Sequence, residues 1–303
     1  MATPSHSTVF EKAITVTPIS LHTYEAHLDQ QWCIGMAPHR GYTTSILYRT
    51  ASLHFKNKTR NNLQDVKLGA RLSTIHVTLS QARSSVDTGE LEAKVAAYVT
   101  VSPPDAEDGR VVKGVWGLSP PPPTSCLSNG LINYAALIEN GKDGSWERYP
   151  RPHPALAVAQ HVELYGPSSS LSARTREERT KGVVNQWARF KPGGEVARWS
   201  NESLMFLVDL FPAVLDRMGM AIEGGPFWYP TVTMNIDLKT RLPLDGMEWL
   251  HSRVATRMLR GSRADLEVLI LNAKGELVAT SSQVALVVDA SRNVKGRQGP
   301  EKL

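Results

Sequence analysis

The second half of the chain has the clearest pattern of apolar and polar positions. Four runs rich in Val, Ile, Leu and Thr cover residues 230–239, 247–259, 262–271 and 276–288. Their length and β-branched composition are typical of strands. Asn272-Ala273-Lys274-Gly275 has the chemistry of a tight turn between the last two runs. The pattern predicts an antiparallel sheet in this half.

A helix is predicted directly before these strands. Ser200-Asn201-Glu202-Ser203 offers a helix N-cap, and a mostly apolar stretch follows at 204–218. This stretch includes Asp209, whose apolar neighbours indicate a buried position. A buried carboxylate without partners is costly, so the pattern favours a dedicated role for Asp209. A strand is expected to start near Trp187, and Gly224-Gly225-Pro226 predicts a turn after the helix.

The first half repeats this order of elements. Residues 41–55 carry apolar or small side chains at roughly helical spacing, which predicts a helix. Residues 72–79 and 91–101 alternate as strands do. Before the helix, residues 23–34 are predicted to be extended and residues 35–41 to form a turn.

Other stretches lack a regular pattern. Residues 1–20 read as a leader with one short apolar segment, and residues 168–181 as a polar, mobile loop. From 102 to 165 the pattern breaks down around Pro103-Pro104 and the run Pro120–Pro123, which is typical of a long connection. We therefore predict four parts, which are an N-terminal domain at 1–105, a proline-rich and polar connection at 106–182, a C-terminal domain at 183–292 and a tail at 293–303.

The two halves also share local sequence. Gly69-Ala70-Arg71 leads to Gly89-Glu90-Leu91-Glu92-Ala93, and Gly261-Ser262-Arg263 leads to Gly275-Glu276-Leu277-Val278-Ala279. This repeat is modest evidence of an internal duplication. Chance similarity between two hairpins is the alternative.

The spacing of the repeat differs between the halves. The segment between the helix and the repeat runs over 219–260 in the second half but only over 56–68 in the first. The first domain is therefore expected to be degenerate and to lack a strand.

The predicted elements can pack as two similar units. A helix wrapped by a curved antiparallel sheet buries one face of the helix and one face of the sheet. Two such units can join their sheets, and ligands would then lie between the two helices.

Composition and charge narrow the functional classes. Hydrophobic residues make up 41% and charged residues 21%, as in ordinary globular proteins. The formal net charge of +5 and the pI of about 9.2 suit an anionic ligand. Basic residues are scattered, and the densest cluster, Lys56–Arg60, has no aromatic side chain that could stack on a base. We therefore expect no nucleic-acid partner.

Cysteine usage and targeting signals give further expectations. Cys33 and Cys126 are too few for a disulfide framework and have no metal-ligand spacing, so a reducing compartment is expected. Neither a secretory signal nor an apolar run of about 18 residues is present, so we expect a cytoplasmic protein without a membrane span. Glu301-Lys302-Leu303 departs from a peroxisomal Ser-Lys-Leu signal.

Several segments resemble a known family. In the second half, the similarity lies in Leu204–Pro212, Trp228–Asp237, Pro243–Leu250 and Gly275–Gln283. The first half contributes Trp32–Gly35 and Gly41-Tyr42. These segments are similar to type II acyl-CoA thioesterases and to the fungal thioesterase-like superfamily. The resemblance implies an α+β fold of two hotdog domains in tandem, and a protein that associates with further copies of itself.

The resemblance also implies a catalytic group. The Asp, Thr and Gln that hold a water in this family fall on Asp209, Thr233 and Gln283. Asp209 would accept the proton of the water, and the other two would position it by hydrogen bonds. The position equivalent to Gln283 in the first half is Ala97, so one site per chain is expected. Neither a metal nor a cofactor is implied, since CoA would be part of the substrate.

Substrate contacts are predicted at two places. Family members often have Asn-Gly-Gly-Tyr at the start of the first helix, where this chain has His39-Arg40-Gly41-Tyr42. Arg40 in place of a glycine could narrow the acyl channel or meet a phosphate. We predict substrate contacts at Arg40, Gly41 and Tyr42, and at a second group formed by Phe227, Trp228 and Tyr229.

Other functional classes would need residues that this sequence lacks, or fit it as well as hydrolysis does. A hotdog hydratase would need His five residues after the helix Asp, where this chain has Val214, and a serine hydrolase would need a G-x-S-x-G elbow, which the sequence lacks. A non-catalytic acyl-binding or scaffold protein stays open. So does a carrier-bound polyketide in place of a fatty acyl-CoA substrate.

Overall fold

The computed structural model describes residues 8–60, 73–82, 90–101, 132–150, 152, 156–168, 182–211, 214–215 and 227–290. Several sequence predictions lie outside these residues. They are the first repeat segment at 69–71, the proline run at 120–123, the loop at 169–181, the turn at 224–226 and the tail at 293–303.

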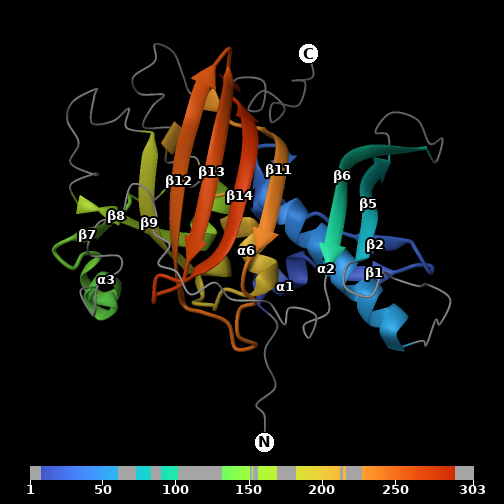
Figure 1. The fold of residues 1–303 in the computed structure, drawn as a ribbon, viewed down its shortest axis with the longest axis horizontal. Coiled ribbons are helices and arrows are strands. Elements are labelled where there is room, and N and C mark those ends of the chain that lie inside the picture. Colours follow the sequence, from blue (N-terminus) through green and yellow to red (C-terminus); the bar gives the residue numbers. More distant parts are fainter. Residues whose placement is uncertain are drawn as a thin grey trace, which may run out of the picture.

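A seven-stranded antiparallel sheet forms the centre of the molecule (Figure 1). Its order is β11-β14-β13-β12-β9-β8-β7. The predicted strand runs are confirmed as β11 (Thr231–Leu238), β12 (Trp249–Arg260), β13 (Arg263–Leu271) and β14 (Leu277–Leu286), with β9 (Val183–Phe190) where a strand start was expected. A short pair, β10 (Phe227–Trp228) and β15 (Val288–Asp289), lies beside this sheet.

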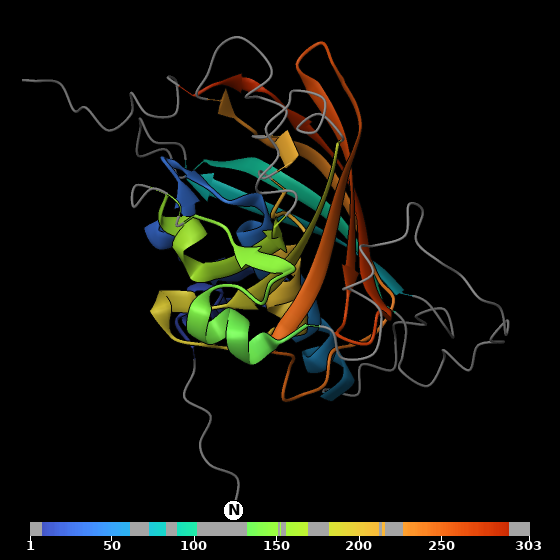
Figure 2. The same cartoon turned by 90° about the vertical axis from the view of Figure 1, so that its left-hand side faces the viewer.

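Two helices lie on one face of this sheet and pack against each other (Figure 2). They are α2 (Arg40–Arg60) and α6 (Asn201–Leu207). A capping box fixes the start of α6, because the Ser200 side chain accepts from the backbone N–H of Ser203 and the Ser203 side chain accepts from that of Ser200. Residues 203–208 are all buried, so α6 forms the middle of the core.

The helix that carries Asp209 is shorter than the sequence predicts. α6 ends at Leu207, and Asp209 lies in the turn that follows it, with its N–H donating to the Phe206 carbonyl at 3.3 Å. Pro212 comes three residues later in the sequence, and a proline disfavours helical backbone at the residue before it. Asp209 is therefore held at a helix end and not on a helix face.

The first half contributes a separate hairpin. β5 (Ser73–Ala82) pairs only with β6 (Leu91–Val101) among the described strands. The hairpin contacts α2, and in Figure 1 it stands across a gap from β11. Of the described residues, two long strands follow α2, whereas four follow α6. The shortening of the first domain stays a prediction, because residues 61–72 lie outside the described part of the chain.

The N-terminal leader is better described as part of the core. α1 (Val9–Ala13) starts with a capping box at Thr8, and both Phe10 and Ile14 are buried in the main core. The stretch 23–34 is not one strand, because Asp29 caps a 3₁₀ turn that interrupts it. Its elements and their neighbours are β1 (Val16–Pro18), β2 (Tyr24–Ala26), η1 (Gln30–Trp32), β3 (Cys33–Ile34) and β4 (Ala37–Pro38).

The prediction that residues 106–182 form only a connection is wrong for those of them that the structure describes. β8 (Val162–Pro167) pairs with β9, and β7 (Trp146–Arg148) pairs with β8, so this stretch extends the central sheet. Large side chains of this stretch pack against β9 and β12 in an aromatic cluster made of Leu137, Trp146, Tyr165, Trp187 and Trp249. The remaining elements here are α3 (Tyr134–Asn140), η4 (Ala157–His161) and, after β9, η5 (Pro192–Gly194).

Candidate active site

Asp209 is the centre of the candidate site. Its side chain is buried, with the residue only 2% exposed. Oδ2 accepts a hydrogen bond from the backbone N–H of Gly41 at 2.7 Å, and Oδ1 accepts one from the Thr231 hydroxyl at 3.0 Å. The carboxylate therefore joins the start of α2, the end of α6 and the start of β11.

Gly41 is required for this close approach. A Cβ atom at residue 41 would lie 2.9 Å from the Asp209 Cβ, 2.9 Å from the Met205 carbonyl oxygen and 2.9 Å from the Phe206 Cα. Backbone atoms cannot move aside as a flexible side chain can. Glycine thus lets the first turn of α2 touch α6, and the partial positive charge of that helix end faces the carboxylate.

His39 is a second titratable group beside Asp209. Its Nδ1 lies 3.4 Å from Asp209 Oδ2, and both side chains are almost fully buried. Burial lowers the pKa of His39, and the charge of Asp209 acts in the opposite direction. His39 is therefore neutral near pH 7.

The environment of Asp209 combines burial with hydrogen-bond donors. Burial raises the pKa of Asp209, and His39, the Gly41 N–H, the Thr231 hydroxyl and Arg40 oppose that rise. A carboxyl group whose pKa is raised by burial, and whose charged form is favoured by hydrogen-bond donors, has the properties of a general base.

Gln283 lies next to this group on β14. Its side-chain Nε2 donates to the Val208 carbonyl at 2.7 Å, which ties it to the turn that carries Asp209. The residue is 4% exposed, and its Oε1 has no hydrogen-bond partner among the described residues. Buried polar atoms are usually satisfied, so this oxygen is unusual, but Gln283 is not among the residues that line the cavity beside Asp209.

The structure places Thr233 outside this group and Thr231 inside it. Thr233 is exposed to solvent, whereas Thr231 is buried and bonds to Asp209. The cause is a β-bulge at Val232, because Thr231 pairs with Ala285 while Thr233 pairs with Val284. One extra residue reverses the alternation of side chains along a strand. The prediction of Thr233 as the hydroxyl partner is corrected to Thr231.

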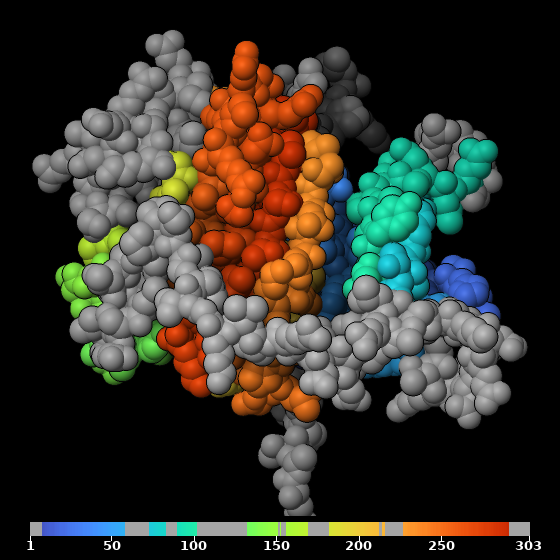
Figure 3. Space-filling model, in the orientation of Figure 1, coloured from blue at the N-terminus to red at the C-terminus, as the bar shows by residue number. Residues whose placement is uncertain are grey.

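A cavity of about 1470 Å³ opens onto this site. Asp209 and Thr231 line it together with the predicted Arg40 and the predicted aromatic group Phe227, Trp228 and Tyr229. On the other side, β5 and β6 contribute four lining residues, which are Leu79, Gln81, Lys94 and Val95. Figure 3 shows the surface hollowed between β11 and this hairpin.

Tyr42 and Gly41 do not line the cavity. The Tyr42 side chain is fully buried, its hydroxyl donates to the Ala13 carbonyl at 2.8 Å, and the same oxygen accepts from the Asp29 N–H at 3.1 Å. Tyr42 thus fastens the N-terminal segment to α2 and is buried away from the lining of the cavity. Gly41 contributes through Asp209 alone.

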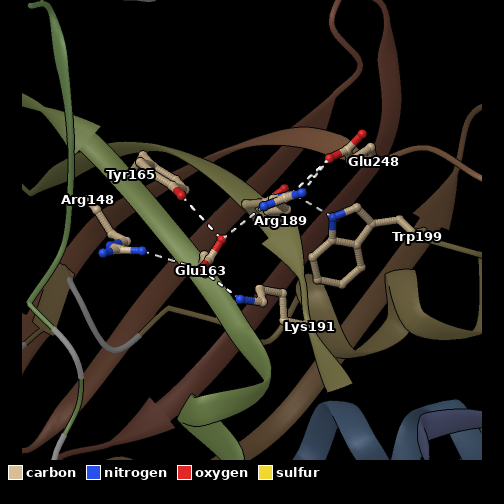
Figure 4. A network of polar contacts seen from close by, with 8 residues as sticks. Arg148, Glu163, Tyr165, Arg189, Lys191, Trp199 and Glu248 are labelled. Carbon is tan, nitrogen blue, oxygen red and sulfur yellow. Dashed lines mark hydrogen bonds and ion pairs between the residues drawn. The ribbon is translucent and has the colours of Figure 1, made fainter. Parts of the chain in front are cut away.

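A charged cluster forms another part of the cavity wall, and sequence reasoning gave no signal for it (Figure 4). Glu163 Oε1 accepts from Lys191 at 3.1 Å and from Arg148 at 3.4 Å, and Glu163 Oε2 lies 3.5 Å from Arg189. Burial alone would raise the pKa of Glu163, but Lys191, Tyr165 and Arg189 lower it on balance. Lys191, Arg148 and Arg189 are already paired with Glu163, so the cluster connects β8 to the neighbouring strands β7 and β9.

The described residues hold no group of three or more His, Cys, Asp or Glu side chains that could bind a metal ion. None of the described helices is both long and apolar enough to cross a membrane.

Sequence comparisons match the part of the chain that carries Asp209. Residues 140–287 match the family model of the acyl-CoA thioesterase C-terminal domain. The chain is 27% identical to the thioesterase-like protein TwmA of Talaromyces wortmannii, over an alignment that covers 98% of this chain and 97% of the relative. That alignment spans 345 positions, which is longer than the chain, so the relative has segments without a counterpart here.

Solved structures share the fold at low sequence identity. A putative thioesterase II from Thermobifida fusca is 17% identical, with a TM-score of 0.58 over 93% of this chain and 98% of its own. A hot dog fold protein from Alicyclobacillus acidocaldarius is 16% identical, with a TM-score of 0.59 over 92% and 97%. The acyl-CoA thioesterase II TesB2 of Mycobacterium marinum is 12% identical, with a TM-score of 0.53 over 94% and 100%. The expected tandem hotdog fold is confirmed.

Proposed function

We propose that this chain hydrolyses an acyl thioester at the site around Asp209, since residues 140–287 match the acyl-CoA thioesterase C-terminal domain and the fold is that of hotdog thioesterases. The observation that carries the proposal is the buried Asp209 carboxylate, which faces a large cavity and is held by the Gly41 N–H and the Thr231 hydroxyl. A buried ionisable group of raised pKa in a cleft is a frequent mark of a catalytic acid or base.

The proposed reaction uses a water molecule. Its oxygen forms a bond to the acyl carbon, its proton passes to Asp209, and the carbon–sulfur bond breaks to release a thiolate. The proton then passes from Asp209 to the thiolate sulfur. The amide of Gln283 is anchored on the Val208 carbonyl, so its role in the proposed reaction is to hold the turn that carries Asp209 in place beside the water. General base catalysis of this kind contributes about 10²–10⁴-fold.

The lining of the cavity supports an acyl thioester as the ligand. Apolar side chains from both halves of the chain, such as Leu79, Leu210 and Phe227, suit an acyl chain. Arg40, at the start of α2, suits the developing negative charge of the carbonyl oxygen or a phosphate of the carrier. CoA and a carrier-bound phosphopantetheine both fit this description.

The test is thiol release from short, medium and long acyl-CoAs and from an acyl-pantetheine thioester, with the wild type beside Asp209→Asn. Turnover that falls at least about 100-fold in a folded Asp209→Asn variant is expected. Saturable binding of these thioesters without any thiol release would instead identify a non-catalytic acyl-binding protein.

A further inference from the structure

His39 is held in place by its backbone as well as by its ring. Its N–H donates to the Trp32 carbonyl at 2.9 Å, and its carbonyl accepts from the Thr43 N–H at 3.0 Å. The ring packs edge-on against Phe206, with centroids 5.0 Å apart. His39 also lines the cavity, and its ring nitrogen Nδ1 lies 3.4 Å from Asp209 Oδ2.

The Nδ1 atom of His39 is buried and makes no regular hydrogen bond with the residues that the structure describes. It faces Asp209 Oδ2 at 3.4 Å. A neutral imidazole carries one proton, on Nδ1 or on Nε2. A bare Nδ1 lone pair would repel the carboxylate oxygen, so the arrangement favours the proton on Nδ1, directed at Asp209.

We propose that His39 is a positioning residue for the hydrolysis proposed above, whose Nδ1–H helps to keep Asp209 ionised and so sets the lower pH limit of the reaction. Two hydrogen bonds already hold this carboxylate, from the Gly41 N–H and the Thr231 hydroxyl, and the His39 ring lies beside its Oδ2 at 3.4 Å. Arg40 is the other charged group that acts on Asp209, and it acts in the same direction. Without these groups, burial would leave Asp209 protonated and unable to accept a proton.

A pair of variants separates the two ring nitrogens. In His39→Asn the side-chain amide can occupy the place of Nδ1, whereas in His39→Gln it reaches toward the place of Nε2. The acid limb of the pH profile of kcat/KM should move upward by about one pH unit in His39→Gln, since a hydrogen bond to a charged group is worth on the order of one pKa unit. In His39→Asn it should stay close to the wild-type position.

Both variants lose the imidazole ring, so a loss of packing against Phe206 is common to them and is measured by thermal unfolding. An unmoved acid limb in His39→Gln overturns the inference. So does an equal fall of activity in both variants at every pH, because that result describes a structural role alone.

A second measurement does not depend on turnover. In ¹⁵N-histidine-labelled protein, nuclear magnetic resonance should show His39 neutral with its proton on Nδ1, and the proton should move to Nε2 in Asp209→Asn. The His39 signal is assigned by its absence in His39→Gln. If no thioester is hydrolysed but this tautomer is found, the proposed function fails and the His39–Asp209 contact stands. A wild-type His39 with its proton on Nε2 overturns the inference, whatever the enzyme activity.

Discussion

The backbone N–H of Gly41 donates a 2.7 Å hydrogen bond to the carboxylate of Asp209, 168 residues further along the chain. This bond joins the N-terminus of α2, in the first half, to the end of α6, in the second half. Neither half contains the candidate site alone. The first half is needed for the site, because it supplies the helix end that faces the carboxylate.

Gly41→Ala should damage stability and activity together. The new Cβ would lie 2.9 Å from two backbone atoms of α6 and from Asp209 Cβ, so the two helices must separate. Overpacking of this kind costs about 1–3 kcal/mol. We expect a lower midpoint of denaturant unfolding and a fall in thiol release.

Thr44→Ala, one turn further along α2, is the control for this change. Thr44 donates only to the Arg40 carbonyl of its own helix, and alanine favours helix, so stability should hardly change. If Gly41→Ala were as stable and as active as Thr44→Ala, the close contact between α2 and α6 would not govern the site.

The two threonines of β11 give a matched pair for the hydroxyl role. Thr231→Val keeps the shape of the side chain but removes the donor to Asp209. Loss of a hydrogen bond to a charged group costs about 1.5–3 kcal/mol, so hydrolysis should fall by roughly 10- to 100-fold. Thr233→Val alters an exposed side chain and should leave kcat/KM near the wild-type value. The reverse result would restore Thr233 as the site residue.

The long strands of the second half were predictable from the sequence, but the position of the threonine beside Asp209 was not. The runs in the second half are regular and bounded by turn residues, so their ends differ from the observed strands by only a few positions. The bulge at Val232 leaves no trace in a chain of strand-forming residues, since it depends on pairing with β14. The family resemblance therefore selected Thr233, and only the strand register shows that Thr231 faces Asp209.

Other parts of the site were invisible for a related reason. Asp209 and Gln283 were found through a resemblance that covers their own segments. His39 was read only as part of a turn, because its contact with Asp209 depends on how α2 approaches α6. The strands β7 and β8 were missed because they are short and lie among proline and polar residues.

Buried histidines should make the fold sensitive to acid. Burial lowers the pKa of His251 to about 3, with Arg253 acting in the same direction. Between the ordinary histidine pKa and that value, the unfolded chain binds a proton that the folded chain does not, so stability falls as the pH falls. The slope for one such group is about 1.4 kcal/mol per pH unit.

His251→Phe tests this contribution, since it keeps an aromatic ring against Trp187. The free energy of unfolding should then decrease less steeply between about pH 6 and pH 4 than in the wild type. The pKa values of His39 and His161 are also lowered, so these two residues account for part of the pH dependence of stability that remains in the His251→Phe variant. An unchanged slope would mean that His251 is protonated in the folded protein.

The central claim is that Asp209 acts on a water molecule and does not itself attack the thioester. A single turnover in H₂¹⁸O, with enzyme in excess over the best acyl-CoA substrate, tests it directly. We predict that the carboxylic acid released in this first turnover carries ¹⁸O from the solvent. Unlabelled acid from the first turnover, with the label found in Asp209 afterwards, would contradict the claim and identify Asp209 as a nucleophile that forms an acyl-enzyme.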